Sequence, residues 1–415
     1  MAKPIRKAAL AFIFITVLLD MLALGITIPV LPKLILGFKG GNSSQAAAVF
    51  GVFGTIFAAM QFFFAPILGA LSDRFGRRPA ILLSNVGLGL DYILMALAPN
   101  LAWLFVGRTI SGICAASFSV PSAYIADVTT PEKRAAGYGM LGAAFGLGFV
   151  IGPAFGGLLG EADPRLPFWI AAALSLANAC YGLFILPESL PAGKRAKFAW
   201  SRANPIASFA LLRKYPGMLA VVSVIMLLYL AHEVLPSMWV LYTDYRYHWN
   251  SRMVGLTLAA VGVFSAVVQG GLIRPGVARM GERNALLFGL FCGAAGFAIY
   301  GLAPTPLIFY WGIPLGALWG FAGPSAQAML SQRVDASEQG RLQGALAGLR
   351  GIMGMIGPTA FTSIFAWSIG PRLPRPVPGA PFLLAAALLL TALLIAWFTT
   401  ARPAKDRPAK APANA

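Results

Sequence analysis

The sequence contains little charge for its length. Charged residues make up only 11% of its 415 residues, against roughly a quarter in ordinary soluble domains, whereas 58% are hydrophobic. This composition excludes a water-soluble fold. A membrane-spanning helix needs about 20 predominantly apolar residues, so a chain of this length has room for about twelve spans joined by short connections.

Acidic residues and cysteines are scarce as well. The 14 acidic residues are outnumbered by 32 basic ones, but the basic residues lie in short gaps between apolar runs rather than on one folded face, so no nucleic-acid partner is expected. The three cysteines, Cys114, Cys180 and Cys292, stand singly in separate runs without C-x-x-C spacing. Neither a disulfide framework nor a metal site is therefore predicted.

Motifs for ATP use and for catalysis are absent. The chain has no G-x-x-x-x-G-K-[ST] loop, which argues against an ATP-driven pump, and no G-x-S-x-G or H-E-x-x-H motif, which argues against an intramembrane enzyme. The longest polar gap, 188–216, is too short for the folded signalling domain of a receptor. These absences favour a transporter that needs no cofactor and takes its energy from an ion gradient.

The apolar runs predict an all-α membrane protein with twelve transmembrane helices in two six-helix bundles. The predicted spans are 8–34, 46–71, 79–98, 101–124, 134–161, 166–187, 217–242, 252–273, 284–303, 306–330, 340–367 and 378–399. With the N-terminus inside, 23 of the 32 Lys and Arg residues lie in cytoplasmic tails and gaps and 7 in outer gaps, which predicts that both termini are cytoplasmic. The predicted domains are a bundle at 1–187, a basic cytoplasmic linker at 188–216, a bundle at 217–400 and a cytoplasmic tail at 401–415.

An internal repeat supports this division. Arg74-Phe75-Gly76-Arg77-Arg78 recurs as Arg279-Met280-Gly281-Glu282-Arg283, 205 residues later, and Gly152-Pro153 recurs as Gly357-Pro358 at the same offset. Six spans, an even number, separate the copies, so the two halves have the same orientation in the membrane. Such parallel repeats occur in transporters that move two bundles about a site near the middle of the bilayer.

Residues 69–79 form the most informative motif. The order Gly69-Ala-Leu-Ser-Asp73-Arg74-Phe75-Gly76-Arg77-Arg78-Pro79 suits a tight reversal between two helices, because Gly76 permits the turn and Pro79 suits the first turn of the next helix. The segment resembles the signature loop of the major facilitator superfamily. That resemblance implies a cytoplasmic gate made by Asp73, Arg74 and Asp127. Further gate residues expected from the loop and its copy are Gly69, Gly76, Arg78, Arg279 and Arg283.

Two further sets of segments narrow the resemblance. Residues 146–157 are similar to the Gly-Pro signature of drug:proton antiporters, in which small residues let helices approach closely. The helix-packing residues expected there and in the repeat are Gly148, Gly152, Pro153, Gly156, Gly357 and Pro358. The segments 20–32, 90–92, 107–112 and 249–255 resemble the tetracycline-efflux branch. This resemblance implies export of a small amphipathic, drug-like compound in exchange for protons, with Asp20, Gln61, Asp91 and Arg108 on the translocation pathway.

The chain departs from that branch in two spans. The branch has an acid in its ninth span, where this chain reads Gly289-Leu-Phe-Cys292-Gly293, and a histidine in its eighth span, where Phe264-Ser265-Ala266 stands. Both residues matter to proton coupling in the branch. Because His232 and Glu233 appear in the seventh span instead, any coupling site is expected to have moved, and the substrate stays open.

Few charged residues lie deep within the spans, where each costs at least about 2.5 kcal/mol. Asp20 and Asp91 both lie about 18 Å past the cytoplasmic start of a span at 1.5 Å per residue, and Arg108 is within side-chain reach of that level. Buried ion pairs stabilise poorly, so proton or ligand binding explains this trio better than helix association. Glu233 is a further proton-coupling candidate, with snorkelling to the membrane surface as its alternative.

The substrate-binding candidates are polar and aromatic residues inside spans: Gln61, Tyr92, His232, Trp239, Trp319 and Arg350. Each has a structural alternative, because aromatic residues of membrane helices often pack or form interfacial belts, and a long basic side chain can snorkel. The resulting prediction is a monomeric, proton-coupled exporter in the lipid bilayer. The alternative is a proton-coupled importer of a sugar, an organic acid or another small metabolite.

Overall fold

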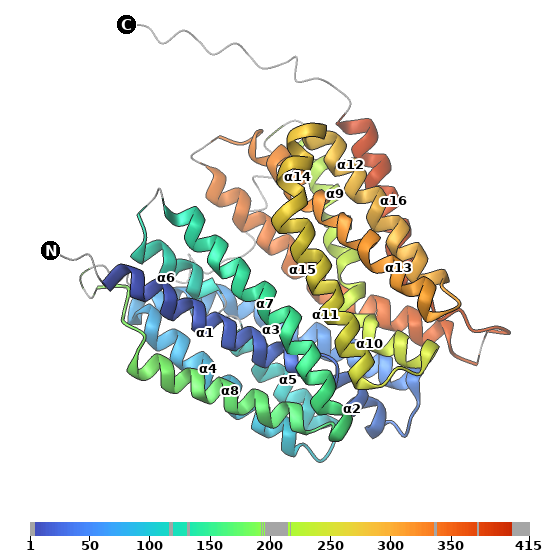
Figure 1. Ribbon diagram of the computed structural model, residues 1–415, viewed down its shortest axis with the longest axis horizontal. Helices are drawn as coiled ribbons and strands as arrows, with labels where there is room; N and C mark the ends of the chain where they lie inside the picture. Colours follow the sequence, from blue (N-terminus) through green and yellow to red (C-terminus); the bar gives the residue numbers. More distant parts are fainter. Residues whose placement is uncertain are drawn as a thin grey trace, which may run out of the picture.

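The computed structural model describes residues 5–115, 119–130, 133–191, 193, 195, 215, 217–335, 338–371 and 373–400. Most of the predicted linker 188–216 and the whole predicted tail 401–415 lie outside these residues. We call 5–191 the N-terminal half and 217–400 the C-terminal half. Figure 1 shows a molecule built from long helices joined by short turns.

The helices of the N-terminal half are α1 (Ile5–Thr27), α2 (Leu31–Phe38), α3 (Ser43–Phe75), α4 (Arg77–Leu97), α5 (Leu101–Ala115), α6 (Val120–Val128), α7 (Arg134–Ala162) and α8 (Leu166–Phe184). Those of the C-terminal half are α9 (Met218–His232), α10 (Val234–Tyr247), α11 (Ser251–Val267), α12 (Ile273–Leu302), α13 (Pro306–Ala317), α14 (Ala322–Ser331), α15 (Gln339–Ser368) and α16 (Ala380–Thr399). A π-helical turn, η6 (Val268–Leu272), joins α11 to α12, and a 3₁₀ turn, η7 (Leu318–Phe321), joins α13 to α14.

The helices have the length and the surface of membrane spans. Within the described residues, 10 helical stretches are long and apolar enough to cross a bilayer. Large apolar side chains such as Leu83, Phe184, Trp311 and Phe398 are exposed on them. Soluble monomers rarely leave so many large apolar side chains exposed. The prediction of an all-α membrane protein is therefore confirmed.

Several helix boundaries differ from the predicted spans. The first span breaks after Thr27 and resumes as α2 at Leu31, because Pro29 lacks the N–H that a continuous helix needs. The predicted loop between the spans 252–273 and 284–303 is itself helical, and the chain leaves helical geometry there only at Gly281. The resulting helical stretch runs from Ser251 to Leu302.

The repeat in the sequence has a counterpart in the backbone. Gly76 (φ 112°, ψ 158°) separates α3 from α4, and Gly281 (φ 76°, ψ 160°) interrupts α12. A positive φ favours glycine because a Cβ would clash with the backbone. The last arginine of each motif copy also makes a similar contact. Arg78 donates to the carbonyl of Gly182 near the end of α8, and Arg283 donates to the carbonyl of Trp397 near the end of α16.

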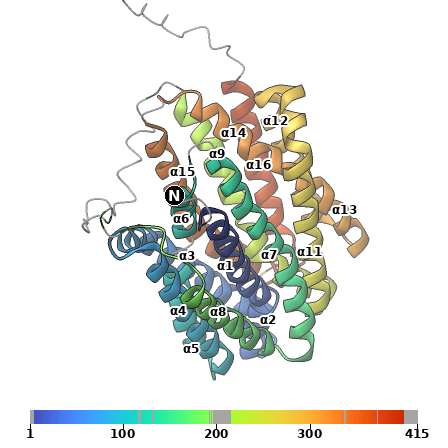
Figure 2. The same ribbon diagram turned by 60° about the vertical axis from the view of Figure 1, so that its left-hand side comes forward.

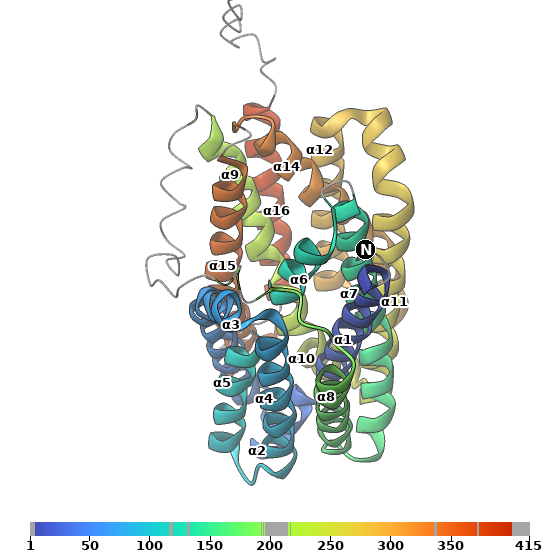
Figure 3. The same ribbon diagram turned by 90° about the vertical axis from the view of Figure 1, so that its left-hand side faces the viewer.

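Helix contacts are dense within each half. In the N-terminal half α1 packs on α7 and α8, and α4 packs on α5 and α8; in the C-terminal half α12 packs on α13, α14 and α16, and α9 on α15 and α16. Figure 3 shows α3, α4 and α5 grouped apart from α12 and α16. The largest contacts between the halves join α3 to α15 and α7 to α11, which lie side by side in Figures 1 and 2.

Candidate functional site: embedded charges and a polar loop

Asp20 is held by a neighbouring helix of its own half. Its side chain lies on α1 and is 8% exposed, and its Oδ1 accepts a hydrogen bond of 2.8 Å from Nδ2 of Asn178 on α8. The same amide also donates to the backbone carbonyl of Thr16. An amide neutralises no charge, so the protein offers this carboxylate one neutral donor and no cation in direct contact among the described residues.

Asp91 lies on α4 and is only 1% exposed. Its Oδ2 accepts a hydrogen bond from the hydroxyl of Ser111 on α5, whereas its Oδ1 is buried with no hydrogen-bond partner. That free oxygen faces α5 where Gly107 has no side chain, since a Cβ on Gly107 would lie 3.0 Å from it. Asp91 therefore keeps one oxygen open to a proton or a polar group.

Arg108 is the embedded cation nearest to Asp91. Its guanidinium lies 4.2 Å from the centre of the Phe57 ring on α3, and its charge acts on Asp91, although no ion pair within 4.0 Å joins the two among the described residues. The Nε of Arg108 is buried and makes no hydrogen bond. The site thus contains an unpaired acceptor and an unpaired donor, which is costly unless a proton, a ligand or water joins them.

Tyr92 connects the two acids. It is 2% exposed, and its hydroxyl lies within electrostatic range of Asp20, Asp91 and Arg108. The structure therefore brings together these four predicted residues from α1, α4 and α5. Chemically, each of the two carboxyl groups can take up and release a proton, because burial in apolar surroundings makes its ionised form costly.

Glu233 occupies a break between two helices of the C-terminal half. It ends α9 and begins α10, and its side chain fits against α15 where two glycines leave space. A Cβ on Gly357 would lie 2.6 Å from Cγ of Glu233, and a Cβ on Gly354 would lie 3.9 Å from its Oε1. Arg350, about two turns along α15, acts on Glu233 electrostatically. Within the described residues, the Glu233 carboxylate makes no hydrogen bond or ion pair.

His232 and Trp319 lie beside this acid. The ring centres of His232 and Trp319 are 5.6 Å apart, and the charge of Arg350 acts on His232 as well. The indole Nε1 of Trp319 is buried without a hydrogen-bond partner, and the guanidinium of Arg350 lies 5.9 Å from the Tyr229 ring. The C-terminal half therefore presents an open donor, an open carboxylate and aromatic faces in one neighbourhood.

Trp239, one of the predicted substrate-binding residues, does not join these groups. Trp239 is 2% exposed and packs between Tyr300 and Phe309, with its Nε1 donating to Thr257. In this structure it has no surface left for a ligand, because its ring and its only polar atom are already satisfied. Gln61 lies half-buried on α3, and among the described residues no hydrogen bond holds its amide.

The loop at Gly76 contains a polar cluster with an arginine at its centre. Arg77 forms ion pairs with Asp73 on α3 and with Asp127 on α6, the latter at 3.2 Å, and it donates to the hydroxyl of Ser72 at 2.7 Å. Asp127 also accepts a hydrogen bond from Ser189. These contacts tie the ends of α3, α4 and α6 together.

The cation of this cluster differs from the two arginines that the sequence suggested. Arg74 is exposed and lies 5.0 Å from the Phe75 ring, and Arg78 donates to backbone carbonyls of α8 instead. Arg77 pairs with Asp73 across the turn at Gly76, where the end of α3 meets the start of α4. Glu188 was also missed: it accepts hydrogen bonds from the backbone N–H groups of Arg77 and Arg78 at the start of α4, where a helix favours negative charge.

The remaining motif residues lie as follows. Gly69 supplies the carbonyl that accepts a hydrogen bond from Ser72, and Arg279 is exposed on α12. Gly148, Gly152 and Gly156 line the contact of α7 with α1, where a Cβ on Gly152 would lie 2.7 Å from Cα of Gly25. Pro153 meets α11, and Pro358 meets Gly54 of α3.

We expect Arg77→Gln to lower the turnover number of transport, as the gate role predicted for this loop implies. Two ion pairs of partly exposed groups, at roughly 0.2 to 1 kcal/mol each, correspond to about a two- to thirtyfold lower turnover number with ligand affinity nearly unchanged. Arg74→Gln is the matched control, because it removes the same charge from the same loop without breaking an ion pair. Equal losses in both variants would contradict this role.

The two halves meet tightly along α3–α15 and α7–α11. Thr55 of α3 donates to the carbonyl of Met355 on α15 at 2.7 Å, and Gly255 of α11 meets Pro153 and Gly157 of α7. Towards the end that carries Arg77, a Cβ on Gly139, Gly142 or Gly146 of α7 would meet nothing within 4 Å. Figure 1 shows α6 and α14 apart from each other at this end of the molecule.

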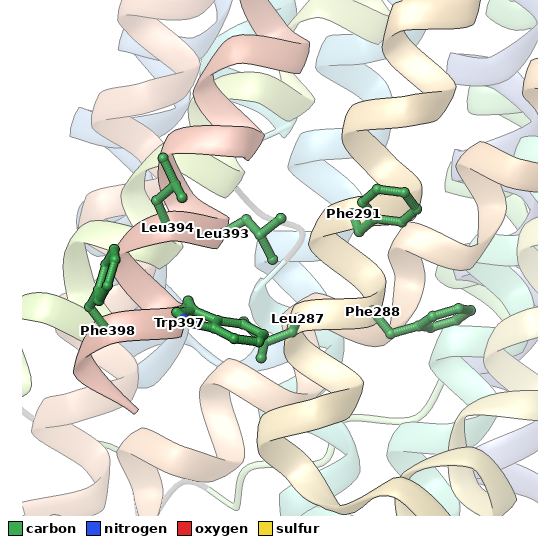
Figure 4. A pocket seen from close by; sticks show the side chains of 7 residues that line it. All are labelled: Leu287, Phe288, Phe291, Leu393, Leu394, Trp397 and Phe398. Atoms are coloured by element: carbon green, nitrogen blue, oxygen red, sulfur yellow. The ribbon is translucent and has the colours of Figure 1, made fainter. Parts of the chain in front are cut away.

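An apolar hollow lies away from these groups, between α12 and α16 (Figure 4). Its volume is about 470 Å³, and its lining consists of Leu287, Phe288, Phe291, Leu393, Leu394, Trp397 and Phe398. Binding sites need a few placed polar groups to orient a ligand, and this lining offers almost none. Nor does the described part of the chain contain a group of three or more His, Cys, Asp and Glu residues that could hold a metal ion.

Comparisons with known proteins agree with this picture. The family profile of the Major Facilitator Superfamily matches residues 13–358. The class C tetracycline resistance protein of Escherichia coli is 39% identical over 360 residues, which cover 87% of this chain and 90% of that protein. The class G protein of Vibrio anguillarum is 36% identical over 355 residues, covering 85% and 89%.

Solved structures show the same fold. The human organic anion transporter MFSD10 (TETRAN) superposes with a TM-score of 0.69 at 24% identity, covering 95% of this chain and 100% of that one. The nucleoside transporter NupG gives a TM-score of 0.75 at 14% identity, covering 95% and 100%. The resemblance read from residues 69–79 is thereby confirmed: the chain belongs to the major facilitator superfamily of membrane transporters, in the branch that contains the tetracycline resistance proteins.

Proposed function

We propose that this protein exports a small amphipathic, drug-like compound across the bacterial inner membrane in exchange for protons. The N-terminal and C-terminal halves are two six-span bundles, of which the second counts Ser251–Leu302 as two spans divided at Gly281. Both termini and the 188–216 linker face the cytoplasm. The Arg77 cluster then lies at the inner end, and the Thr55 contact lies at the outer end.

The observation that carries this proposal is the state of Asp91. Its Oδ1 and the Nε of Arg108 are both buried and unpaired, beside Tyr92 and Asp20. An ionised carboxylate in this position is expensive, so uptake of a proton or contact with a ligand changes its free energy strongly. A site with that property can couple proton binding to the movement of two bundles, which is what exchange requires.

The arrangement of the halves supports loading from the inside. With the outer end closed along α3–α15 and α7–α11 and the inner ends apart, ligand reaches the embedded residues from the cytoplasm. His232, Trp319 and Arg350 with Glu233 supply aromatic faces and polar groups from one bundle, and Arg108 supplies a polar group from the other. Such a mixed lining suits an amphipathic compound.

The names of the relatives narrow the substrate class. Proteins called tetracycline resistance proteins are related over almost their whole length, which favours export of a drug-like compound over import of a metabolite. The tetracycline-efflux branch has an acid in its ninth span and a histidine in its eighth span, and this chain has neither. Tetracycline is therefore the first compound to test, and the substrate itself stays open. No cofactor is required, and the energy source is the proton gradient.

Everted membrane vesicles test this proposal. A thermal-shift screen of the purified protein against tetracyclines, dyes and polyamines first identifies a compound that stabilises the protein. The vesicles are then incubated with that compound, labelled, in the external medium. We expect energised vesicles to accumulate it, and a protonophore to release it. Accumulation in right-side-out vesicles instead would support the importer and contradict export.

A further inference from the structure

Two polar contacts join the halves at the end where they are closed. Lys33 of α2 forms an ion pair with Asp244 of α10 at 3.3 Å, and its ammonium also donates to the carbonyl of Trp249 at 2.6 Å. On the other side of the same loop, Nδ2 of Asn250 donates to Oε1 of Glu161 on α7 at 2.8 Å. Two side chains of the N-terminal half therefore hold the end of α10 and the turn 248–250 of the C-terminal half.

The turn 248–250 is fixed to its own half, the C-terminal one. Trp249 is 6% exposed, its ring centre lies 5.5 Å from those of Phe309 and Tyr310, and it belongs to the core cluster of the C-terminal half. His248 takes up a left-handed conformation with φ 55°, which reverses the chain between α10 and α11. The Trp249 carbonyl is thus presented at a defined position rather than on a loose segment.

Lys33 and Glu161, which contact this turn and the end of α10, are fixed to the N-terminal half. Lys33 lies between Leu31 and Ile35, which are buried in a core cluster of the N-terminal half. Glu161 lies in the last turn of α7, a helix packed on α1 through Gly148, Gly152 and Gly156. Because each partner is rigid within its half, these contacts break only when one half moves against the other.

The geometry points to a device that holds the outer end shut. We propose that Lys33, Glu161, Asp244, Trp249 and Asn250, here called the outer clasp, keep the transporter closed to the outside while ligand loads from the inside. This inference rests on the proposed function. It gives Lys33 and Glu161 a positioning role, because they hold the two halves in one arrangement and do not bind the ligand. Side-chain exposures of 19% for Lys33 and 27% for Asp244 leave the ion pair weak enough to open in every cycle.

A buried reporter measures opening of this end without any transport. Ala47 lies on α3 but is fully buried within the core cluster of the C-terminal half, so it is covered only while the halves are closed there. In a variant whose three native cysteines are replaced by alanine, Ala47→Cys is labelled with a membrane-impermeant maleimide added from outside. Its labelling rate reports the fraction of molecules that are open outward.

We expect Lys33→Glu and Asp244→Lys each to raise that labelling rate roughly two- to fivefold, and the double variant to bring it back towards wild type. Lys39→Glu is the matched control, since it reverses the same charge at the same end and forms no ion pair within the described residues. Glu161→Leu is expected to raise labelling, whereas Glu161→Gln keeps an oxygen that accepts from Asn250 and is expected to leave it unchanged.

Transport kinetics give a second readout. In everted vesicles Lys33→Glu is expected to raise KM two- to fivefold at unchanged or higher kcat, because fewer molecules are open to the cytoplasm when ligand arrives. A side chain that only supports the fold would lower kcat instead. Unchanged labelling in the single variants, or no recovery in the double variant, overturns the clasp. If the protein transports nothing, the proposed function fails while the labelling result still decides the clasp.

Discussion

Replacing Asp91 with asparagine is expected to abolish accumulation of ligand against a gradient. A proton moving through about 100 mV supplies roughly 2.3 kcal/mol, and one pH unit adds about 1.4 kcal/mol, so exchange of one proton for a neutral ligand can sustain a gradient of several hundredfold. An asparagine cannot take up the proton, so the gradient should fall to nearly one. Asp20→Asn is expected to do the same, since Asp20 belongs to the same group around Tyr92.

Exchange without an energy source separates coupling from general damage. Asparagine resembles a protonated carboxyl group, and Ser111 or Asn178 can still donate a hydrogen bond to its carbonyl oxygen. We therefore expect at least one of the two variants to exchange labelled for unlabelled ligand at near wild-type rate. Asp163→Asn, the same change on an exposed residue beyond α7, serves as the control. Normal accumulation in both embedded variants would make Glu233 the leading proton carrier.

Gly255→Leu is expected to have the second largest effect, because it inserts a side chain where α7 and α11 touch. A Cβ at this position would lie 3.0 Å from Cα of Gly157 and would also collide with the carbonyl of Pro153, both of which are backbone atoms on the opposing helix. The outer end then cannot close. We expect transport to fall more than about tenfold and labelling of Ala47→Cys from outside to rise, since the balance between states shifts outward.

A matched glycine and a smaller side chain test whether the wedge is the cause. Gly37→Leu adds the same side chain at the same end, on α2, where nothing lies within 4 Å, and is expected to leave transport and labelling unchanged. Gly255→Ala brings only the Cβ and should shift labelling in the same direction by a smaller amount. Lost transport without increased labelling would show that Gly255→Leu harms folding rather than closure.

The membrane spans were predictable because their signal is local. Apolar runs bounded by charges locate most helices to within a few residues, and the repeat at Gly76 and Gly281 reappears as two positive φ angles. The helix breaks were harder to place. Glu233 interrupts a run that is apolar on both sides, so no polar gap marks the division between α9 and α10.

The interaction partner of a side chain was harder to predict than the helix that carries it, because the partner depends on the direction in which the side chain points. Three arginines stand close together at 74, 77 and 78. Only the four-residue spacing between Asp73 and Arg77 could have identified Arg77 as the partner of Asp73. Trp239 illustrates the opposite error: its place in a span suggested a binding surface, but Tyr300 and Phe309 from distant helices cover it. Lys33 gave no signal at all, since its partner lies 211 residues away.

Proton movement in a purified system tests the central claim most directly. Proteoliposomes that contain only this protein and a pH-sensitive dye are given a ligand gradient across the membrane, without any imposed pH difference. We expect ligand that flows one way to drive protons the other way, and a reversed ligand gradient to reverse the pH change. Asp91→Asn is expected to abolish the pH change. Protons moving with the ligand, or no pH change during measured ligand flux, would contradict the central claim.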